Sequence, residues 1–174
     1  PELLSRSDVV GTGGHCAVGG GGRGGDAGAV GGDGAVGLCA VLSARRQGAT
    51  RIIAMWRHEA RSPIAVEFGA TDVVGERGEA GVARVRELTD GLGVDAALEC
   101  VGTDESMRTA LDMVRPGGRI GFVGVPHGGT VPIEGLFGRN VRVGGGGGPG
   151  GGGLPALRRV CPCLFNIRAP PPDR

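Results

Sequence analysis

The fold is decided by the stretch Ala29-Val-Gly-Gly-Asp-Gly-Ala-Val-Gly37-Leu-Cys-Ala-Val-Leu42. Gly32, Gly34 and Gly37 form a G-x-G-x-x-G pattern between a short Ala/Val run and an apolar segment of helical length. In a strand–turn–helix unit, the first glycine permits the tight turn and the second lets the backbone approach a pyrophosphate, while the third allows helix and strand to pack closely. Free N–H groups at the helix start then face the phosphate charge. The pattern predicts a dinucleotide-binding turn, but because 39 of the 174 residues are glycine, a loop without ligand stays open as the alternative.

Short β-like runs alternate with amphipathic segments of helical length between residues 26 and 143. This alternation is typical of a parallel sheet with crossover helices, so we expect an α/β fold with a doubly wound parallel sheet. Pro63 inside the second helical segment favours a helix start at Ser62, with Pro63 in the first position. The expected strands are 27–31, 51–56, 72–74, 94–100, 119–125 and 140–143, and the expected helices are 35–47, 59–68, 79–90 and 104–114.

Two glycine-rich segments do not fit a packed domain. Residues 19–25 contain a single non-glycine residue, Arg23, and nine of the ten residues from Gly144 to Gly153 are glycine. Glycine on that scale does not repay the backbone entropy lost on ordering. We therefore expect a lead-in helix and glycine-rich linker over 1–25, a dinucleotide-binding domain over 26–143 and an irregular Gly/Pro-rich tail over 144–174.

The charge balance and the hydropathy pattern of the chain argue against binding to nucleic acid or to membranes. The 19 basic and 18 acidic residues nearly balance, so we expect no general attraction to nucleic acid or to anionic membranes. No apolar run approaches the length of a membrane span. The spacings of the five cysteines match neither a disulfide framework nor paired zinc knuckles, and no signal-peptide pattern precedes them. We expect a cytoplasmic protein.

Six segments, in this order and at this spacing, resemble the cofactor domain of zinc-dependent medium-chain alcohol dehydrogenases. The resemblance covers about residues 3–143 and implies a Rossmann-type fold with a nicotinamide cofactor across the carboxyl ends of the strands. In that family a zinc, in the cleft to a separate catalytic domain, polarises the substrate oxygen while hydride moves to or from the nicotinamide. The segments are Ser7-Asp-Val-Val-Gly-Thr-Gly-Gly-His15, Gly32–Gly37, Ile52-Ile-Ala-Met-Trp-Arg-His-Glu-Ala-Arg61, Glu67-Phe-Gly-Ala-Thr-Asp-Val-Val74, Ala97-Leu-Glu-Cys-Val-Gly102 and Pro116-Gly-Gly-Arg-Ile-Gly-Phe-Val-Gly-Val-Pro126.

The resemblance leaves the catalytic part of the family without a counterpart. The family's catalytic domain precedes the cofactor domain and supplies a Cys and a His as zinc ligands. The 174 residues of this chain contain no sequence that matches that domain. We therefore expect a C-terminal fragment that is inactive alone and has no catalytic residue of its own. Asp8 lies before Thr12-Gly13, where the family places its third zinc ligand; a solvated or helix-capping aspartate is the alternative.

The choice of cofactor is predicted from the end of the second strand, where an NAD enzyme presents Asp or Glu to the ribose. Trp56 stands there, followed by Arg57 and His58, with Arg61 as a further candidate contact. The missing carboxylate and the arginine favour NADP. NAD stays open, because the bulky Trp56 could clash with or stack on the adenosine and because Arg57 and His58 could be solvated loop residues.

The leading hypothesis is the cofactor-binding part of an NADP(H)-dependent zinc-type oxidoreductase that acts on a small alcohol or carbonyl compound. It allows for a homo-oligomer. A nucleotide-binding module without catalysis and a truncated fragment without function are the alternatives.

By resemblance, residues 101–102 and 124–125 line the ribose and nicotinamide, mainly through backbone, with ordinary turns as the alternative. The predicted cofactor-binding residues are Gly32, Gly34, Ala35, Val36, Gly37, Trp56, Arg57, His58, Arg61, Val101, Gly102, Gly124 and Val125, and the predicted metal ligand is Asp8.

Overall fold

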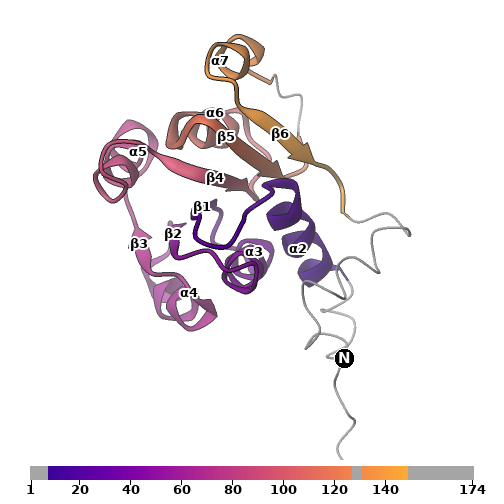
Figure 1. The fold of residues 1–174 in the computed structure, drawn as a ribbon. Helices are drawn as coiled ribbons and strands as arrows, with labels where there is room; N and C mark the ends of the chain where they lie inside the picture. Colours follow the sequence, from indigo (N-terminus) through magenta and orange to yellow (C-terminus); the bar gives the residue numbers. More distant parts are fainter. Residues whose placement is uncertain (1–7, 127–130, 149–174) are drawn as a thin grey trace, which may run out of the picture.

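A computed structural model describes residues 8–126 and 131–148. Six strands form one parallel sheet in the order β3-β2-β1-β4-β5-β6 (Figure 1). The predicted doubly wound parallel sheet is therefore confirmed. The strands are β1 (Ala27–Gly31), β2 (Arg51–Met55), β3 (Asp72–Val74), β4 (Val94–Glu99), β5 (Val114–Phe122) and β6 (Arg142–Gly145).

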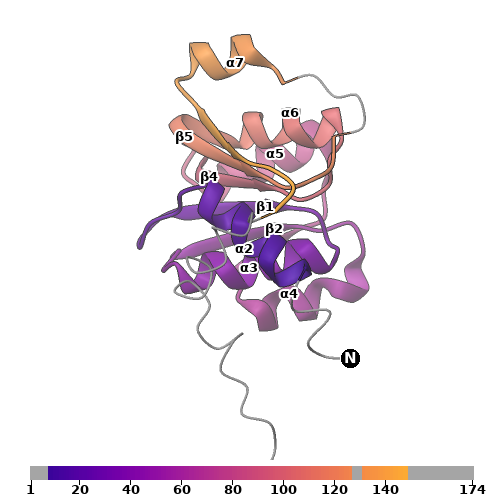
Figure 2. The same cartoon turned by 90° about the vertical axis from the view of Figure 1, so that its right-hand side faces the viewer.

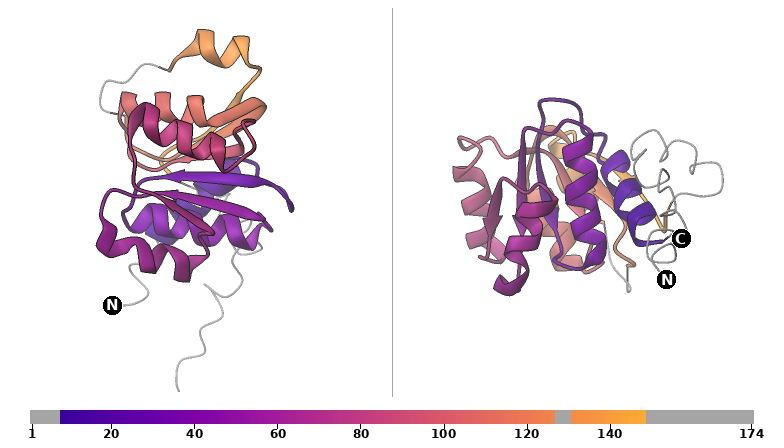
Figure 3. Two further views of the ribbon diagram at one scale, coloured as in Figure 1. Left: turned by 90° about the vertical axis from the view of Figure 1, so that its left-hand side faces the viewer. Right: turned by 90° about the horizontal axis from the view of Figure 1, so that it is seen from below.

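The helices form a layer on each face of the sheet (Figures 2 and 3). One layer holds the first three helices, and the other holds the next two, with the last helix beyond them. The helices are α2 (Val9–Gly19), α3 (Ala35–Arg46), α4 (Ser62–Phe68), α5 (Gly78–Glu87), α6 (Asp104–Met113) and α7 (Ile133–Gly138), and a 3-10 turn, η1 (Glu59–Arg61), precedes α4. The predicted start of α4 at Ser62 is confirmed, whereas α7 lies in a stretch for which the sequence predicted no helix.

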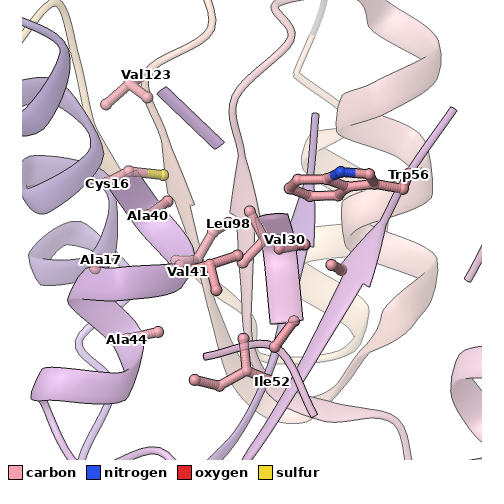
Figure 4. Close-up of a cluster of buried hydrophobic side chains, with 13 residues drawn as sticks. Cys16, Ala17, Val30, Ala40, Val41, Ala44, Ile52, Trp56, Leu98 and Val123 are labelled. Atoms are coloured by element: carbon pink, nitrogen blue, oxygen red, sulfur yellow. The ribbon is translucent and has the colours of Figure 1, made fainter. Parts of the chain in front are cut away.

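Two hydrophobic clusters, one on each face, make up the core. Successive side chains of β2 point to opposite faces of the sheet and so belong to different clusters. Ile52 and Ala54 pack in the cluster beneath α2, α3 and α4, and Ile53 packs in the cluster beneath α5 and α6. Both clusters consist largely of alanine and valine, so helices and strands lie close together (Figure 4).

Glycine makes that close approach possible where α2 crosses the sheet. A Cβ added at Gly121 of β5 would lie 2.1 Å from the carbonyl oxygen of Cys16, and one added at Gly20 would lie 2.6 Å from Leu98 Cδ2. The prediction that residues 19–25 stand outside the packed domain is therefore wrong for the start of that segment. Gly19 ends α2, and Gly20 is buried.

Two further predictions about glycine are corrected at the end of the sheet. Residues 115–118, which the expected ranges place between helix 104–114 and strand 119–125, fall inside β5, at an irregularity in its pairing with β4. Gly144 and Gly145, expected to begin the irregular tail, pair with β5 as the end of β6. The rest of the predicted tail, from residue 149 onward, lies outside the described residues. Among the helices that are described, none is long and apolar enough to cross a bilayer.

Candidate cofactor-binding site

The glycine turn joins β1 to α3 in the geometry that its sequence predicts. Gly32 has φ +116°, a conformation that L side chains rarely adopt, and a Cβ added at Gly37 would lie 1.8 Å from the carbonyl oxygen of Gly32. Gly34 differs, because no heavy atom of the described residues lies within 4 Å of the Cβ it lacks. The first and third glycines are thus required by the chain itself, whereas the second leaves room for a ligand.

Backbone amides at the start of α3 supply donors beside that open space. Gly34 is the N-cap, and the first helical hydrogen bond runs from Leu38 N to the carbonyl oxygen of Gly34, 3.0 Å away. The amides of Ala35, Val36 and Gly37 precede this bond and therefore have no acceptor within the helix. Such amides, at the positive end of the helix dipole, attract an anionic group.

A pocket of about 250 Å³ opens beside the turn, at the carboxyl ends of β1, β2 and β4. Strand order reverses between β1 and β4, the place where open parallel sheets bind ligands. Five predicted residues line the pocket: Gly32, Trp56, Arg57, His58 and Val101. The lining does not include the other eight: Gly34, Ala35, Val36, Gly37, Arg61, Gly102, Gly124 and Val125.

Asp33, which the sequence analysis did not single out, belongs to the glycine turn after β1, contacts the residues that follow β2 and lines this pocket. Its Oδ2 accepts hydrogen bonds from the backbone N–H groups of Arg57 (3.2 Å) and His58 (2.9 Å) and lies 2.5 Å from His58 Nδ1. Arg61 Nη1 donates to the Asp33 carbonyl oxygen at 2.9 Å and lies 3.8 Å from Oδ1. The inference that no carboxylate stands here is therefore wrong, because the glycine turn supplies one.

The surroundings of Asp33 keep its carboxyl group ionised. Desolvation raises the pKa of Asp33, but hydrogen bonds from the ring and backbone of His58 and from the Arg57 backbone outweigh it and hold the pKa below its ordinary value. Spacing could not reveal the contact, since Asp33 and Arg57 are 24 residues apart. An acidic residue between the first two glycines of the motif was the available signal.

Trp56 borders the pocket but keeps its side chain in the core. It is 3% exposed and belongs to the cluster on the α3 and α4 face, together with Ile52 and Ala54 (Figure 4). Its Nε1 is buried and has no hydrogen-bond partner within the part of the chain that the structure describes. An indole placed this way does not offer adenosine the stacking surface considered for it, so a cofactor contact by Trp56 is left to its backbone.

Glu99, at the end of β4, holds the loop that carries two of the predicted residues. It is 2% exposed, and its Oε1 accepts from Val101 N, Gly102 N and Ser106 Oγ, each at 2.7 Å. Gly102 has φ +92°, and a Cβ there would lie 2.4 Å from the carbonyl oxygen of Val125. The loops after β4 and β5 are therefore packed together. The signal missed in the sequence was a single acidic residue at the end of an apolar strand.

Asp8, the predicted metal ligand, stands exposed at the N-cap position of α2. Its carboxylate accepts from Thr12 Oγ1 at 3.3 Å and makes no hydrogen bond to the first-turn backbone. Over residues 8–126 and 131–148, no group of three or more His, Cys, Asp or Glu side chains could hold a metal ion. A catalytic zinc needs about three protein ligands. The donors among the described residues therefore do not fit a catalytic zinc.

Comparison with known proteins identifies the family to which this chain belongs. Residues 35–150 match the family model of the zinc-binding dehydrogenases. The alcohol dehydrogenase of Cupriavidus necator is 39% identical over 134 residues, which are 76% of this chain and 37% of that protein. The NADP-dependent isopropanol dehydrogenase of Thermoanaerobacter brockii is 42% identical over 95 residues, which are 55% of this chain and 27% of that protein.

Among solved structures, an alcohol dehydrogenase from Thermus sp. ATN1 superposes with a TM-score of 0.79 at 32% identity. The superposition covers 94% of this chain and 46% of that structure. The chain therefore spans less than half the length of each of these relatives. Because the matched model covers more than half of this sequence, the chain belongs to the zinc-binding dehydrogenase family.

Proposed function

We propose that this chain is the cofactor-binding part of a zinc-type alcohol dehydrogenase that transfers a hydride between NADP(H) and a small alcohol or carbonyl compound. The observation that carries the proposal is the glycine turn, with open space at Gly34, beside a pocket at the carboxyl ends of the strands. The nicotinamide ring, when bound, supplies the site that gives or accepts the hydride. This chain's residues bind and orient the cofactor.

Different elements of the site bind different parts of the cofactor. The free amides at the start of α3 suit the pyrophosphate, which can approach across the open face of Gly34. The loops after β4 and β5, held by Glu99 and by the close approach of Gly102 to Val125, offer backbone groups to the ribose and nicotinamide. The pocket between β2 and α6 accepts the adenosine end.

Preference for NADP(H) rests on basic side chains after β2. Arg57, His58 and Arg61 lie there, and even with the Asp33 carboxylate among them the two arginines leave a net positive charge. A guanidinium can bind a phosphate through two parallel hydrogen bonds. The NADP-dependent relative from Thermoanaerobacter brockii supports this choice.

Calorimetric titration of the 174-residue chain with NADPH and NADH tests the proposal. We expect tighter binding of NADPH, and we expect Arg57→Ala to weaken NADPH more than NADH because only NADPH carries the 2′-phosphate. Arg23→Ala, which removes an exposed arginine that does not line the cofactor pocket, is the matched control. Equal or reversed affinities would remove the NADP preference, and failure to bind either cofactor would remove the proposed site.

A nucleotide-binding module without catalysis is the second candidate, because the described donors do not fit zinc. We expect the chain by itself to hold no stoichiometric zinc and to show no turnover with short alcohols, aldehydes or ketones. Mass spectrometry for bound metal and an NADPH oxidation assay measure both. One tightly held zinc per chain, or turnover that Asp8→Ala abolishes, would show that the chain carries a catalytic centre of its own.

A further inference from the structure

The geometry points to Asp33 as the residue that sets cofactor discrimination: its carboxylate weakens the binding of a ribose 2′-phosphate relative to that of a free 2′-hydroxyl. The inference rests on the proposed function and sharpens it, because it names a residue that limits the preference for NADP(H). An acidic residue at the end of β2 would act in the same way, but here the carboxylate comes from the glycine turn after β1.

The position of the Asp33 carboxylate is well determined by its partners. Oδ2 is surrounded by three donors: the backbone N–H groups of Arg57 and His58 and the ring of His58. Only 16% of the Asp33 side chain is exposed, whereas 55% of the His58 side chain is. The carboxylate is thus fixed against the chain after β2, in a pocket that Arg57 and His58 also line.

The second oxygen of that carboxylate, Oδ1, gives the discrimination its chemical basis. Oδ1 has Arg61 Nη1 at 3.8 Å, beyond hydrogen-bond distance, so it can accept a hydrogen bond from another donor. A ribose 2′-hydroxyl is such a donor. A 2′-phosphate near neutral pH is largely dianionic and meets the carboxylate as a like charge, while it competes with it for His58 and Arg61.

Other charges around the pocket do not remove this effect. Glu76, Glu99, Glu105 and Arg77 also line it, three acidic groups and one basic group, so they add no surplus of positive charge. Of the basic side chains after β2, His58 and Arg61 already interact with Asp33, which leaves Arg57 to meet a 2′-phosphate there. The carboxylate therefore opposes a 2′-phosphate at the point where the cations attract it.

The test compares two probes that differ only by the 2′-phosphate: adenosine 2′,5′-bisphosphate and adenosine 5′-monophosphate. In Asp33→Asn we expect the affinity for the bisphosphate to rise on the order of tenfold, because a unit like charge a few ångströms away is removed. Affinity for the monophosphate should stay unchanged or fall. The gain should shrink as salt is raised from 0.05 to about 0.5 M, which an effect of side-chain positioning would not do.

Asp90→Asn is the matched control, because it removes the same charge shortly before β4, at the amino ends of the strands and away from the pocket at their carboxyl ends. Asp90 is exposed and has φ +52°, a conformation that asparagine accepts readily. Neither probe should respond to it. Asp33→Ser, whose hydroxyl can still accept from a backbone N–H, is the second variant if Asp33→Asn does not fold, as judged by circular dichroism.

The outcomes separate this inference from the proposed function. Unchanged or weaker binding of the bisphosphate in Asp33→Asn and Asp33→Ser would overturn the inference and leave the NADP preference standing. A wild-type chain that prefers the monophosphate, with a gain for the bisphosphate in Asp33→Asn, would support the inference and overturn the preference. Binding of neither probe by any variant would overturn both.

Discussion

The two glycine-rich stretches of the chain, residues 19–25 and 32–37, contain glycine for different physical reasons. At the start of the first stretch, added Cβ atoms would meet the protein itself: Gly144 O at 2.7 Å from Gly19, and Leu98 Cδ2 at 2.6 Å from Gly20. In the second stretch, Gly37 meets the backbone of Gly32, but Gly34 faces open space. Glycine there serves packing at one position and access at another.

The difference shows that a glycine pattern alone does not distinguish a binding turn from a packing contact. What distinguishes them is whether the missing side chain would strike the protein or would project into space that a ligand can use. Substitutions at single glycines can therefore separate stability from binding, and they can be ranked by the contact that each would make.

The largest effect is expected for Gly37→Ala. The new Cβ would lie 1.8 Å from the carbonyl oxygen of Gly32, a backbone atom that cannot move without opening the turn between β1 and α3. We expect the free energy of unfolding to fall by about 3 kcal/mol or more, measured by urea unfolding followed by circular dichroism. A loss below about 0.5 kcal/mol would show that Gly37 is not needed for packing.

Gly34→Val should have the opposite effect, with stability retained and cofactor affinity lost. Its φ of −84° suits any L residue, and the added Cβ would have no described heavy atom within 4 Å beyond its chain neighbours, so stability should change by less than about 1 kcal/mol. Affinity for NADPH should fall roughly a hundredfold, which is about 2.8 kcal/mol, because the branched side chain occupies the approach of the pyrophosphate. Calorimetric titration measures it.

Gly24→Ala is the control for that variant, because Gly24 also has no described heavy atom, beyond its chain neighbours, within 4 Å of the Cβ it lacks, yet it lies in the other glycine stretch. Neither stability nor affinity should change by a measurable amount. Equal losses of affinity in Gly24→Ala and Gly34→Val, or none in either, would mean that residues 32–37 are only a connecting turn.

A smaller effect is expected for Gly20→Ala, in the first stretch. The Cβ would meet Leu98 Cδ2 at 2.6 Å, the end of a side chain that can shift, so unfolding should become easier by about 1–2 kcal/mol. Cofactor affinity should fall far less than in Gly34→Val, because Gly20 does not line the pocket and reaches it only through a shift of Leu98, which does. A thermal melt with and without NADPH measures both. Full stability in this variant would return residues 19–25 to the role of a linker.

The contrast between the stretches also explains how far the sequence could be interpreted. Local signals located β1 to β4, the start of α4 at Ser62 and the turn at Gly32–Gly37, because each depends on neighbours along the chain. The contacts of Asp33 with His58, and of Gly20 with Leu98, join residues far apart in sequence and follow from the fold. Local patterns therefore predicted the frame of the site but not the carboxylate within it.

The side of the sheet to which Trp56 turns shows the same limit. The residue stands at the predicted position after β2, but whether its indole faces the ligand or the core depends on the pleat of a strand that is almost entirely apolar. When both faces of a parallel sheet are buried, hydrophobicity does not mark one of them as the ligand side. Trp56 continues the alternation of Ile52 and Ala54 and joins their cluster.

The smallest effect concerns the junction of the first glycine stretch with the sheet. Asp95 Oδ2 accepts from Ala27 N at 2.8 Å, and its Oδ1 pairs with Arg115 Nε at 2.7 Å. Desolvation raises the pKa of Asp95, but these two partners outweigh it and lower the pKa below its ordinary value. A carboxyl group with a lowered folded-state pKa stabilises the fold above its unfolded pKa, near 4, and the contribution is lost as pH falls through the folded value.

Asp95→Asn should therefore reduce stability at pH 7 by no more than about 1 kcal/mol, since the ion pair is partly exposed to solvent. The difference from the wild-type chain should shrink as pH falls below about 4, because the contribution of the Asp95 carboxylate is lost between the unfolded-state pKa and the lower folded-state pKa. Urea unfolding at pH 7, 5 and 3 measures it, with Asp90→Asn as the control for loss of an exposed charge. A difference that persists unchanged at pH 3 would mean that Asp95 joins the glycine stretch to the sheet by its shape, and that its charge contributes nothing there.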